Sequence, residues 1–243
     1  MKLSFLIFPI DFYNNPKLLT PGFDGTTIPF WFSTSTINAR SLKNLGLANN
    51  NMYTTPGMLM FHFRNYLEWL NLSHNHFELL GHFSNLVLIP NFPYMKNLKT
   101  LLLRYSGILS IELDTFVQLY NLRHLDLTGN GLLFVPKSVL LSSLESLNLS
   151  YQNDSSVNFI KFRLEEGIFE QGNMTNLKNL SLSGVNMKLL KKRAFAGLPN
   201  LETLNLDHTT IESIEDEIFV NLTNLKSMNE KLQSKTYIFD INL

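Results

Sequence analysis

Three histidines, His74, His76 and His82, form the cluster in this sequence whose residue types are best suited to metal chemistry. Imidazole nitrogens bind Zn²⁺ and related ions, so a group of neighbouring histidines is a candidate metal site. Asn75 separates His74 from His76 and occupies a turn position of a recurring pattern. We therefore expect these two imidazoles to leave the chain in different directions. The sequence predicts no metal site and no cofactor.

Residues that could support catalysis are also scattered. Asp114, Asp126 and Asp207 occupy different positions of the recurring pattern, so they predict no carboxylate pair for acid–base chemistry. The sequence contains no Gly-x-Ser-x-Gly nucleophile motif, no phosphate-binding loop, no His-Glu-x-x-His motif and no cysteine. These features predict that the chain is not an enzyme.

The recurring pattern is Leu-x-x-Leu-x-Leu-x-x-Asn-x-Leu, and its clearest copy starts at Leu122. Three of the steps between copies are 24 residues long. A fixed period of this length is typical of stacked supersecondary units that share one continuous core. We predict a leucine-rich repeat solenoid of the α/β class, a curved horseshoe with a parallel β-sheet on its concave face. The copies start at Leu42, Leu67, Leu98, Leu122, Leu144, Leu177, Leu201 and, more weakly, Leu225.

Each position of the pattern has a physical role. Alternating leucines predict a strand whose every second side chain points into the core. The asparagine side chain carries donors and an acceptor for the backbone of neighbouring repeats, so Asn50, Asn75 and Asn130 predict a structural ladder. Val185 cannot make these bonds, and we expect a local distortion there with Asn186 shifted in. The other copies place Ser106, Gln152 and Thr209 at this position.

A second pattern predicts how the return segments are filled. A phenylalanine is followed three residues later by an apolar residue, and the next strand begins three residues after that, as in Phe116, Leu119 and Leu122. We interpret this stripe as core filling behind the sheet, beneath a helical or 3₁₀ turn, rather than as a cofactor site. The same spacing recurs at Phe92, Phe195 and Phe219.

The phrases NLRHLDLTGNGLLFVP, SLESLNLS, AFAGLPNLETLNL and IFVNLTNLKS resemble the typical class of animal extracellular leucine-rich repeats. Toll-like receptors and chaoptin-like adhesion proteins contain such repeats. The resemblance implies a non-catalytic module that binds a protein ligand or co-receptor, at the cell surface or outside the cell. Ectodomains of this class seal their ends with cysteine-stapled caps, whereas this chain has no cysteine. Either the caps lie outside this chain, which we favour, or the protein is an intracellular scaffold in the cytoplasm.

The domain organisation follows from the repeats. We predict an irregular N-terminal segment or degenerate cap at 1–41, a repeat array at 42–228 with about seven or eight repeats, and a C-terminal tail or truncated repeat at 229–243. Longer loops are expected near 78–91 and 153–168. Residues 1–10 are typical of either a signal-peptide core or a degenerate repeat strand. No apolar stretch approaches the roughly 18 residues that a membrane-spanning helix needs.

Partner contacts are expected on the concave face, in the second to fifth repeats. The chain has 20 basic and 20 acidic residues, so its net charge predicts no nucleic-acid binding. Large, aromatic and charged residues are expected to gather there, and Trp, Tyr and Arg are common anchors in protein interfaces. The predicted contact residues are Trp69, His74, Leu102, Arg104, Tyr105, His124, Asp126 and Tyr151.

Six Asn-x-Ser/Thr sequons mark candidate glycosylation sites. Asn173 and Asn221 precede strands on the return side, where a glycan would be harmless. Asn71 and Asn148 are expected in strands on the concave face, where a glycan would crowd the predicted contacts. The remaining sequons are Asn153 and Asn179.

Two charged runs lie one repeat apart on the return side. Residues 191–193 are basic and residues 215–217 are acidic. We expect them to face solvent and to pair with each other, rather than to form a phosphate-binding site.

Overall fold

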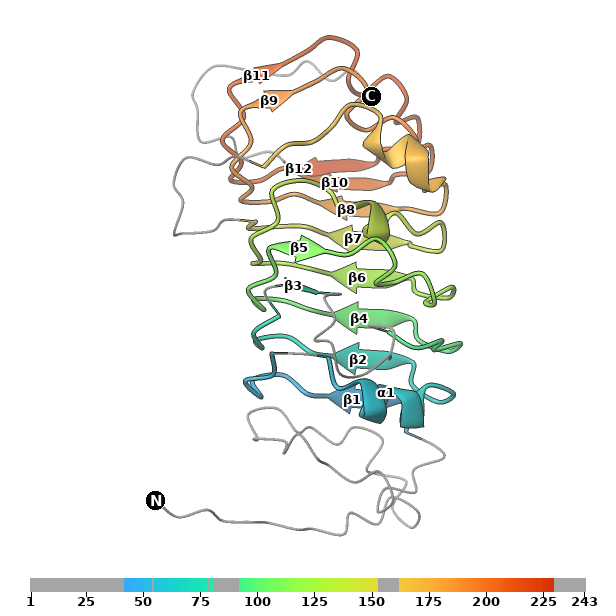
Figure 1. Cartoon of the computed structure of the whole chain (residues 1–243). Coiled ribbons are helices and arrows are strands. Elements are labelled where there is room, and N and C mark those ends of the chain that lie inside the picture. The colour runs from blue at the N-terminus through green and yellow to red at the C-terminus, as the bar shows by residue number, and fades with distance from the viewer. Residues whose placement is uncertain (1–41, 54, 78, 81–91, 153–161, 230–243) are drawn as a thin grey trace.

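The protein is a stack of similar turns, each of which contributes one short strand to a single parallel sheet (Figure 1). The structure is a computed structural model that describes residues 42–53, 55–77, 79–80, 92–152 and 162–229. The predicted segment 1–41 and residues 230–243 of the predicted tail lie outside the described residues, as do His82 and Asn153.

The main sheet has eight strands, and strands from successive turns pair in parallel with every repeat position opposite its equivalent. The central leucines, such as Leu101 and Leu125, face each other in register and are fully buried. The predicted parallel-sheet solenoid is therefore confirmed. Its strands are β1 (Asn44–Gly46), β2 (Trp69–Asn71), β4 (Thr100–Leu102), β6 (His124–Asp126), β7 (Ser146–Asn148), β8 (Asn179–Ser181), β10 (Thr203–Asn205) and β12 (Ser227–Asn229).

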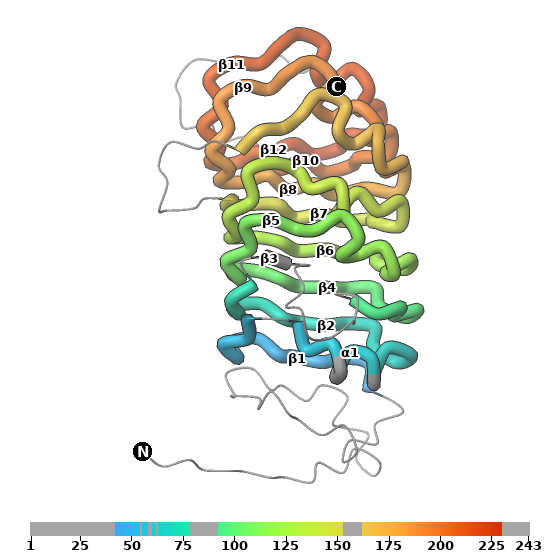
Figure 2. Tube along the Cα trace, viewed as in Figure 1, coloured from blue at the N-terminus to red at the C-terminus, as the bar shows by residue number. Residues whose placement is uncertain are grey.

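The return segments lie on the side opposite the main sheet, and their conformation varies from turn to turn (Figure 2). The described part contains one α-helix, α1 (Gly57–Phe63), and the 3₁₀ helices η2 (Lys137–Val139) and η3 (Ile168–Gly172). Two small parallel sheets pair β3 (Leu79–Leu80) with β5 (Ser110–Ile111), and β9 (Leu189–Leu190) with β11 (Ser213–Ile214). Within the predicted long loop at 153–168, the described residues Phe162 and Leu164 are buried in the core.

Phenylalanines fill the space between the main sheet and the return segments. Phe92, Phe116 and Phe195 are fully buried, and the ring centroids of Phe92 and Phe116 lie 5.5 Å apart. Phe169 from η3 and Phe63 from α1 are buried as well. Because a single turn cannot enclose its own apolar side chains, each ring depends on the neighbouring turns for burial.

Buried asparagines bond the turns that follow β2 and β6 to the preceding repeats. The Asn130 amide nitrogen donates to the carbonyl oxygens of Leu103 (2.8 Å) and Leu127 (2.7 Å). Its oxygen accepts from the backbone N–H groups of Ser106 (3.0 Å) and Ile108 (3.1 Å). One side chain therefore bonds to four buried backbone groups, of which Leu127 O also accepts a second bond, from the Gln152 amide.

The same position in other repeats shows which side chains can replace this amide. Gln152 donates to Leu127 O at 2.7 Å and accepts from Leu132 N–H at 3.1 Å, whereas the Thr209 hydroxyl donates to Leu206 O at 2.8 Å. Val185 fills the position with a fully buried apolar side chain. Asn186 does not shift in as expected, because its side-chain oxygen instead accepts from the Thr210 hydroxyl.

Candidate functional site

The outward side chains of the eight main strands form one surface, here named the sheet face. The strand register places Trp69, Thr100 and His124 side by side on β2, β4 and β6. Leu102 and Asp126 are neighbours in the next column. Parallel neighbouring strands lie about 4.8 Å apart, so these side chains are close enough for one ligand to contact them all. The register thus brings together residues that the sequence placed on this surface.

Two of the predicted contact residues are bonded to each other. The Arg104 Nε lies 2.7 Å from the Asp126 carboxylate, and Asp126 is only 7% exposed. The other carboxylate oxygen accepts from the Thr128 backbone N–H (3.0 Å) and hydroxyl (2.6 Å). Charge-assisted bonds of this kind hold both side chains in place. The Arg104–Asp126 pair is therefore a fixed polar feature of the sheet face.

A column of residues with left-handed backbone follows the strands at one edge of the sheet face. We name it the turn row. Three residues after the end of each of the first seven main strands, φ is positive, and the backbone N–H groups of the first six of these residues donate to the next repeat at 2.7–3.1 Å. Gly and Asn adopt this conformation most readily, whereas bulky side chains rarely do. The members of the turn row are Asn49, His74, Tyr105, Gly129, Tyr151, Gly184 and His208.

Within the turn row, each tyrosine lies over a glycine of the following repeat. A Cβ at Gly129 would come within 2.2 Å of the Tyr105 ring, and one at Gly184 within 2.3 Å of the Tyr151 ring. The glycines therefore leave the space that the two rings occupy. The His74 ring lies nearly parallel to Tyr105 with a centroid distance of 5.2 Å. Tyr105 and Tyr151 remain 50% and 43% exposed, so the rings are fixed yet accessible.

At the opposite edge, the residue just before each strand is charged in every repeat. We name these residues the edge column. Glu68 bonds to both Lys43 and Lys99 at 2.8 Å, and Glu145 bonds to both Arg123 and Lys178 at 3.3 Å. The sequence signal for the edge column is a charged second residue in each Leu-x-x-Leu-x-Leu copy, which becomes a set only when the copies are aligned. Its members are Lys43, Glu68, Lys99, Arg123, Glu145, Lys178, Glu202 and Lys226.

Glu68 lies between two ammonium groups, which lower the pKa of its carboxyl group. Hydrogen bonds from Lys43 and then Lys99 lower the pKa of Glu68 from 4.5 to about 2. The stabilising contribution of this carboxylate is therefore complete above pH 4.5 and is lost as the pH falls toward 2. We expect Lys43→Met and Lys99→Met each to raise the pKa, measured from the side-chain carboxyl carbon by NMR. An unchanged titration in both variants would contradict the assigned cause.

His74 and His76, the two described histidines of the candidate metal cluster, are separated. The His74 ring lies against Tyr105, whereas the His76 ring lies against Tyr53 with a centroid distance of 5.3 Å. Their backbone N–H groups donate to opposite neighbours, Arg104 O and Met52 O. Across the described residues, no three or more His, Cys, Asp or Glu side chains are grouped to hold a metal ion.

The sequons occupy two kinds of surface. Asn71 and Asn148 lie partly buried on the sheet face, and their side-chain oxygens each accept a backbone N–H two residues later at 3.0 Å. Asn179 is exposed on β8 of the same face. Asn173 and Asn221 are exposed on the return side. A glycan at either of the last two positions would leave the sheet face open.

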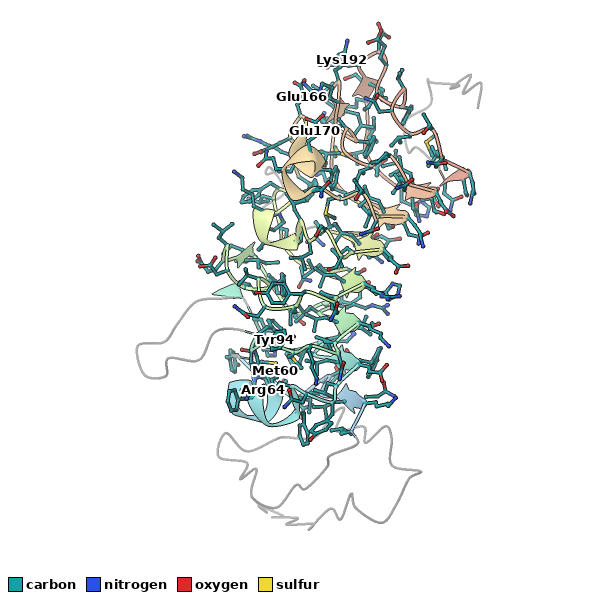
Figure 3. The ribbon with its side chains drawn as sticks, turned by 90° about the vertical axis from the view of Figure 1, so that its right-hand side faces the viewer. Met60, Arg64, Tyr94, Glu166, Glu170 and Lys192 are labelled. Atoms are coloured by element: carbon teal, nitrogen blue, oxygen red, sulfur yellow. The ribbon has the colours of Figure 1, made fainter. Side chains whose placement is uncertain are left out.

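The charged runs at 191–193 and 215–217 pair with each other on the return side, and the basic run also pairs with the preceding repeat. Lys192 pairs with Glu217 at 2.7 Å, and this contact lowers the pKa of Glu217, whereas Arg193 pairs with Glu170 of the preceding repeat at 2.6 Å. An open depression of about 440 Å³ adjoins this second pair. Figure 3 shows Glu166, Glu170 and Lys192 near one end of the stack, far from Met60, Arg64 and Tyr94 at the other.

The continuous core, the stacked parallel strands and the bonded repeat turns define a solenoid repeat protein. A family model described as "Leucine rich repeat" matches residues 95–154 and 172–229, and a second one with the same description matches residues 66–86. The chain belongs to the leucine-rich repeat proteins. A search of curated proteins finds no significant match.

Solved structures with the same fold come from different organisms. The Drosophila Toll chain in its glycosylated complex with Spatzle is 22% identical with a TM-score of 0.63, over 86% of this chain and 26% of that chain. A leucine-rich repeat protein of Leptospira interrogans is 24% identical with a TM-score of 0.63, over 84% of this chain and 47% of that one. This chain therefore spans less than half of either protein's solved chain.

Leucine-rich repeats are generally a non-catalytic, protein-interacting fold. Within the described residues, the helices are all too short or too polar to cross a membrane.

Proposed function

We propose that this protein is a non-catalytic binding module that holds a protein partner on its sheet face. The observation that carries the proposal is the gathering of large side chains on adjacent strands of that face. Trp69, Leu102 and His124 lie on β2, β4 and β6, and Tyr105 and Tyr151 project from the turns that follow β4 and β7. Trp and Tyr are enriched among the few residues that supply most of the binding energy in protein interfaces.

The distribution of side chains supports a partner centred on the first half of the sheet. The later strands β8, β10 and β12 present small polar residues in the same columns, such as Ser181, Thr203 and Ser227. These residues contribute complementarity rather than strong anchoring. The balanced total charge supports a protein ligand over a nucleic acid.

We further propose that the protein works at the cell surface or outside the cell, as the ligand-recognition or adhesion part of a receptor. The similarity to Toll, whose structure was solved in complex with Spatzle, supports a protein ligand in that setting. The exposed sequons at Asn173 and Asn221 support passage through the secretory pathway, because glycans there would not obstruct the sheet face.

One experiment tests both parts of this proposal. The full chain is produced in secreting animal cells with a photo-crosslinking residue at position 100 on the sheet face, or at position 113 on the return side as a control. We expect position 100 to give discrete crosslinked proteins, position 113 to give none of these, and Trp69→Ala to reduce them by about tenfold. Peptide mapping of the secreted material should find glycans on Asn173 and Asn221.

The outcomes separate the two parts. Equal crosslinking from positions 100 and 113, or no effect of Trp69→Ala, would contradict binding on the sheet face. Retention in the cell without glycans, combined with crosslinking from position 100 to cytoplasmic proteins, would replace the receptor with an intracellular scaffold.

A further inference from the structure

We propose that the turn row binds a proline-rich segment of the partner in the polyproline II conformation, with Tyr105 and Tyr151 as its two anchors. This inference rests on the proposed function, since it names the chemistry of the protein partner. It adds a specific edge of the sheet face and a specific backbone conformation of the bound segment.

The first step is the conformational cost of these tyrosines. Their φ angles are +47° and +55°, in a region that bulky L residues avoid. Gly129 and Gly184 occupy the same repeat position, and glycine adopts a positive φ at little energetic cost. Neither tyrosine fills the core, because about half of each side chain is exposed. Unfavourable backbone conformations of this kind are often kept at binding sites.

The second step is the rigidity of the two rings. Each ring occupies the space above a glycine, where any Cβ would collide with it, and Tyr105 also lies against the His74 ring. A ring that is already fixed loses little conformational entropy when a ligand packs on it. Each tyrosine also carries a hydroxyl, a group that can donate to a peptide carbonyl.

The third step is the spacing of the anchors. Tyr105 follows β4 and Tyr151 follows β7, each at the third residue after its strand, and only β6 lies between these strands. Two strand separations are about 9.4–9.8 Å. A polyproline II helix has three residues per turn with a rise of about 3.1 Å each, so it repeats every ~9.3 Å. Prolines at positions i and i+3 of such a segment would therefore meet the two rings in succession.

Rigid aromatic side chains at this spacing favour a proline-rich segment over other peptides. Proline-rich segments dock onto aromatic surfaces because their extended helix is already formed before binding. A β-strand would place its side chains on one face about 6.8 Å apart, which does not match the two rings. The bound segment would run across the strands, parallel to the long axis of the stack.

The test uses fluorescein-labelled decaproline as the probe, a Gly-Ser peptide of equal length as the control peptide, and the full chain. Fluorescence anisotropy should show saturable binding of decaproline and none of the Gly-Ser peptide. Tyr105→Gly and Tyr151→Gly should each weaken binding by about tenfold, and the double variant should abolish it. Tyr120→Ala, which removes an exposed tyrosine on the return side, should have no effect.

The same tyrosine variants also provide the control for correct folding. Glycine suits the positive φ at both positions, so thermal unfolding of the tyrosine variants should occur at or above the wild-type temperature. Equal affinity of the double variant and the wild type, or equal binding of the Gly-Ser peptide, would overturn the proposal. Crosslinking from position 100 without decaproline binding would remove this inference alone, whereas loss of that crosslinking would remove the proposed function.

Discussion

Asn130→Ala is expected to lower the free energy of unfolding by about 4 kcal/mol, a large effect for a single polar substitution. The side chain is 2% exposed and bonds to two carbonyl oxygens and two backbone N–H groups from two repeats. Alanine would leave three of these groups buried without this partner, since Leu127 O also accepts from the Gln152 amide, and each such group costs about 1–3 kcal/mol. Partial access of water to the vacated space keeps the total below the simple sum.

Urea denaturation followed by circular dichroism measures this effect, and the chain offers a matched control. Asn121 is exposed and donates a single bond to Lys96 O at 2.6 Å. Asn121→Ala should change the unfolding free energy by less than about 0.5 kcal/mol. Similar losses in the two variants would show that the buried amide does not have the role assigned to it.

Phe116→Ala is expected to cost about 3–5 kcal/mol, because it opens a cavity between the main sheet and the return segments. The ring is fully buried and packs against Phe92 of the preceding turn. Its removal therefore weakens the contact between two repeats as well as the packing within one. Since neighbouring repeats stabilise each other, we expect the transition to broaden as well as to move to lower urea concentration.

Phe134 is the control for this substitution, because it is 50% exposed on the return side. Phe134→Ala should cost less than about 1 kcal/mol. Phe116→Leu should recover more than half of the loss, since it restores most of the buried volume. A Phe116→Ala protein as stable as the wild type would mean that the phenylalanine stripe does not join the turns.

The repeat pattern predicted the architecture because its signal is local and recurs. Each Leu-x-x-Leu-x-Leu copy specifies one strand, and the common period places equivalent residues side by side, as Leu101 and Leu125 show. The columns of the sheet face follow from that alignment. The same argument predicted the buried phenylalanines, because their distance from the next strand is constant.

Features that depend on contacts between repeats could not be predicted in the same way. The pairing of Arg104 with Asp126 requires side-chain conformations that no spacing specifies. The tyrosines of the turn row lie over Gly129 and Gly184 only because those glycines belong to the following turns. The two-residue strands of the small sheets carry no periodic signal at all, since alternation needs a longer segment to be recognised.

The edge column has a consequence for how the repeats can be rearranged. Its charges alternate except at Lys99 and Arg123, where two cations are neighbours and each is neutralised by a glutamate on its far side. Each repeat therefore carries one charge at this edge, and that charge is opposite to the charge of at least one neighbouring repeat. Exchanging the repeats that contain Glu145 and Lys178 would place Lys178 next to Arg123 and Glu145 next to Glu202, so two attractive contacts would become repulsive. The units of this array share one shape, yet they are not interchangeable building blocks.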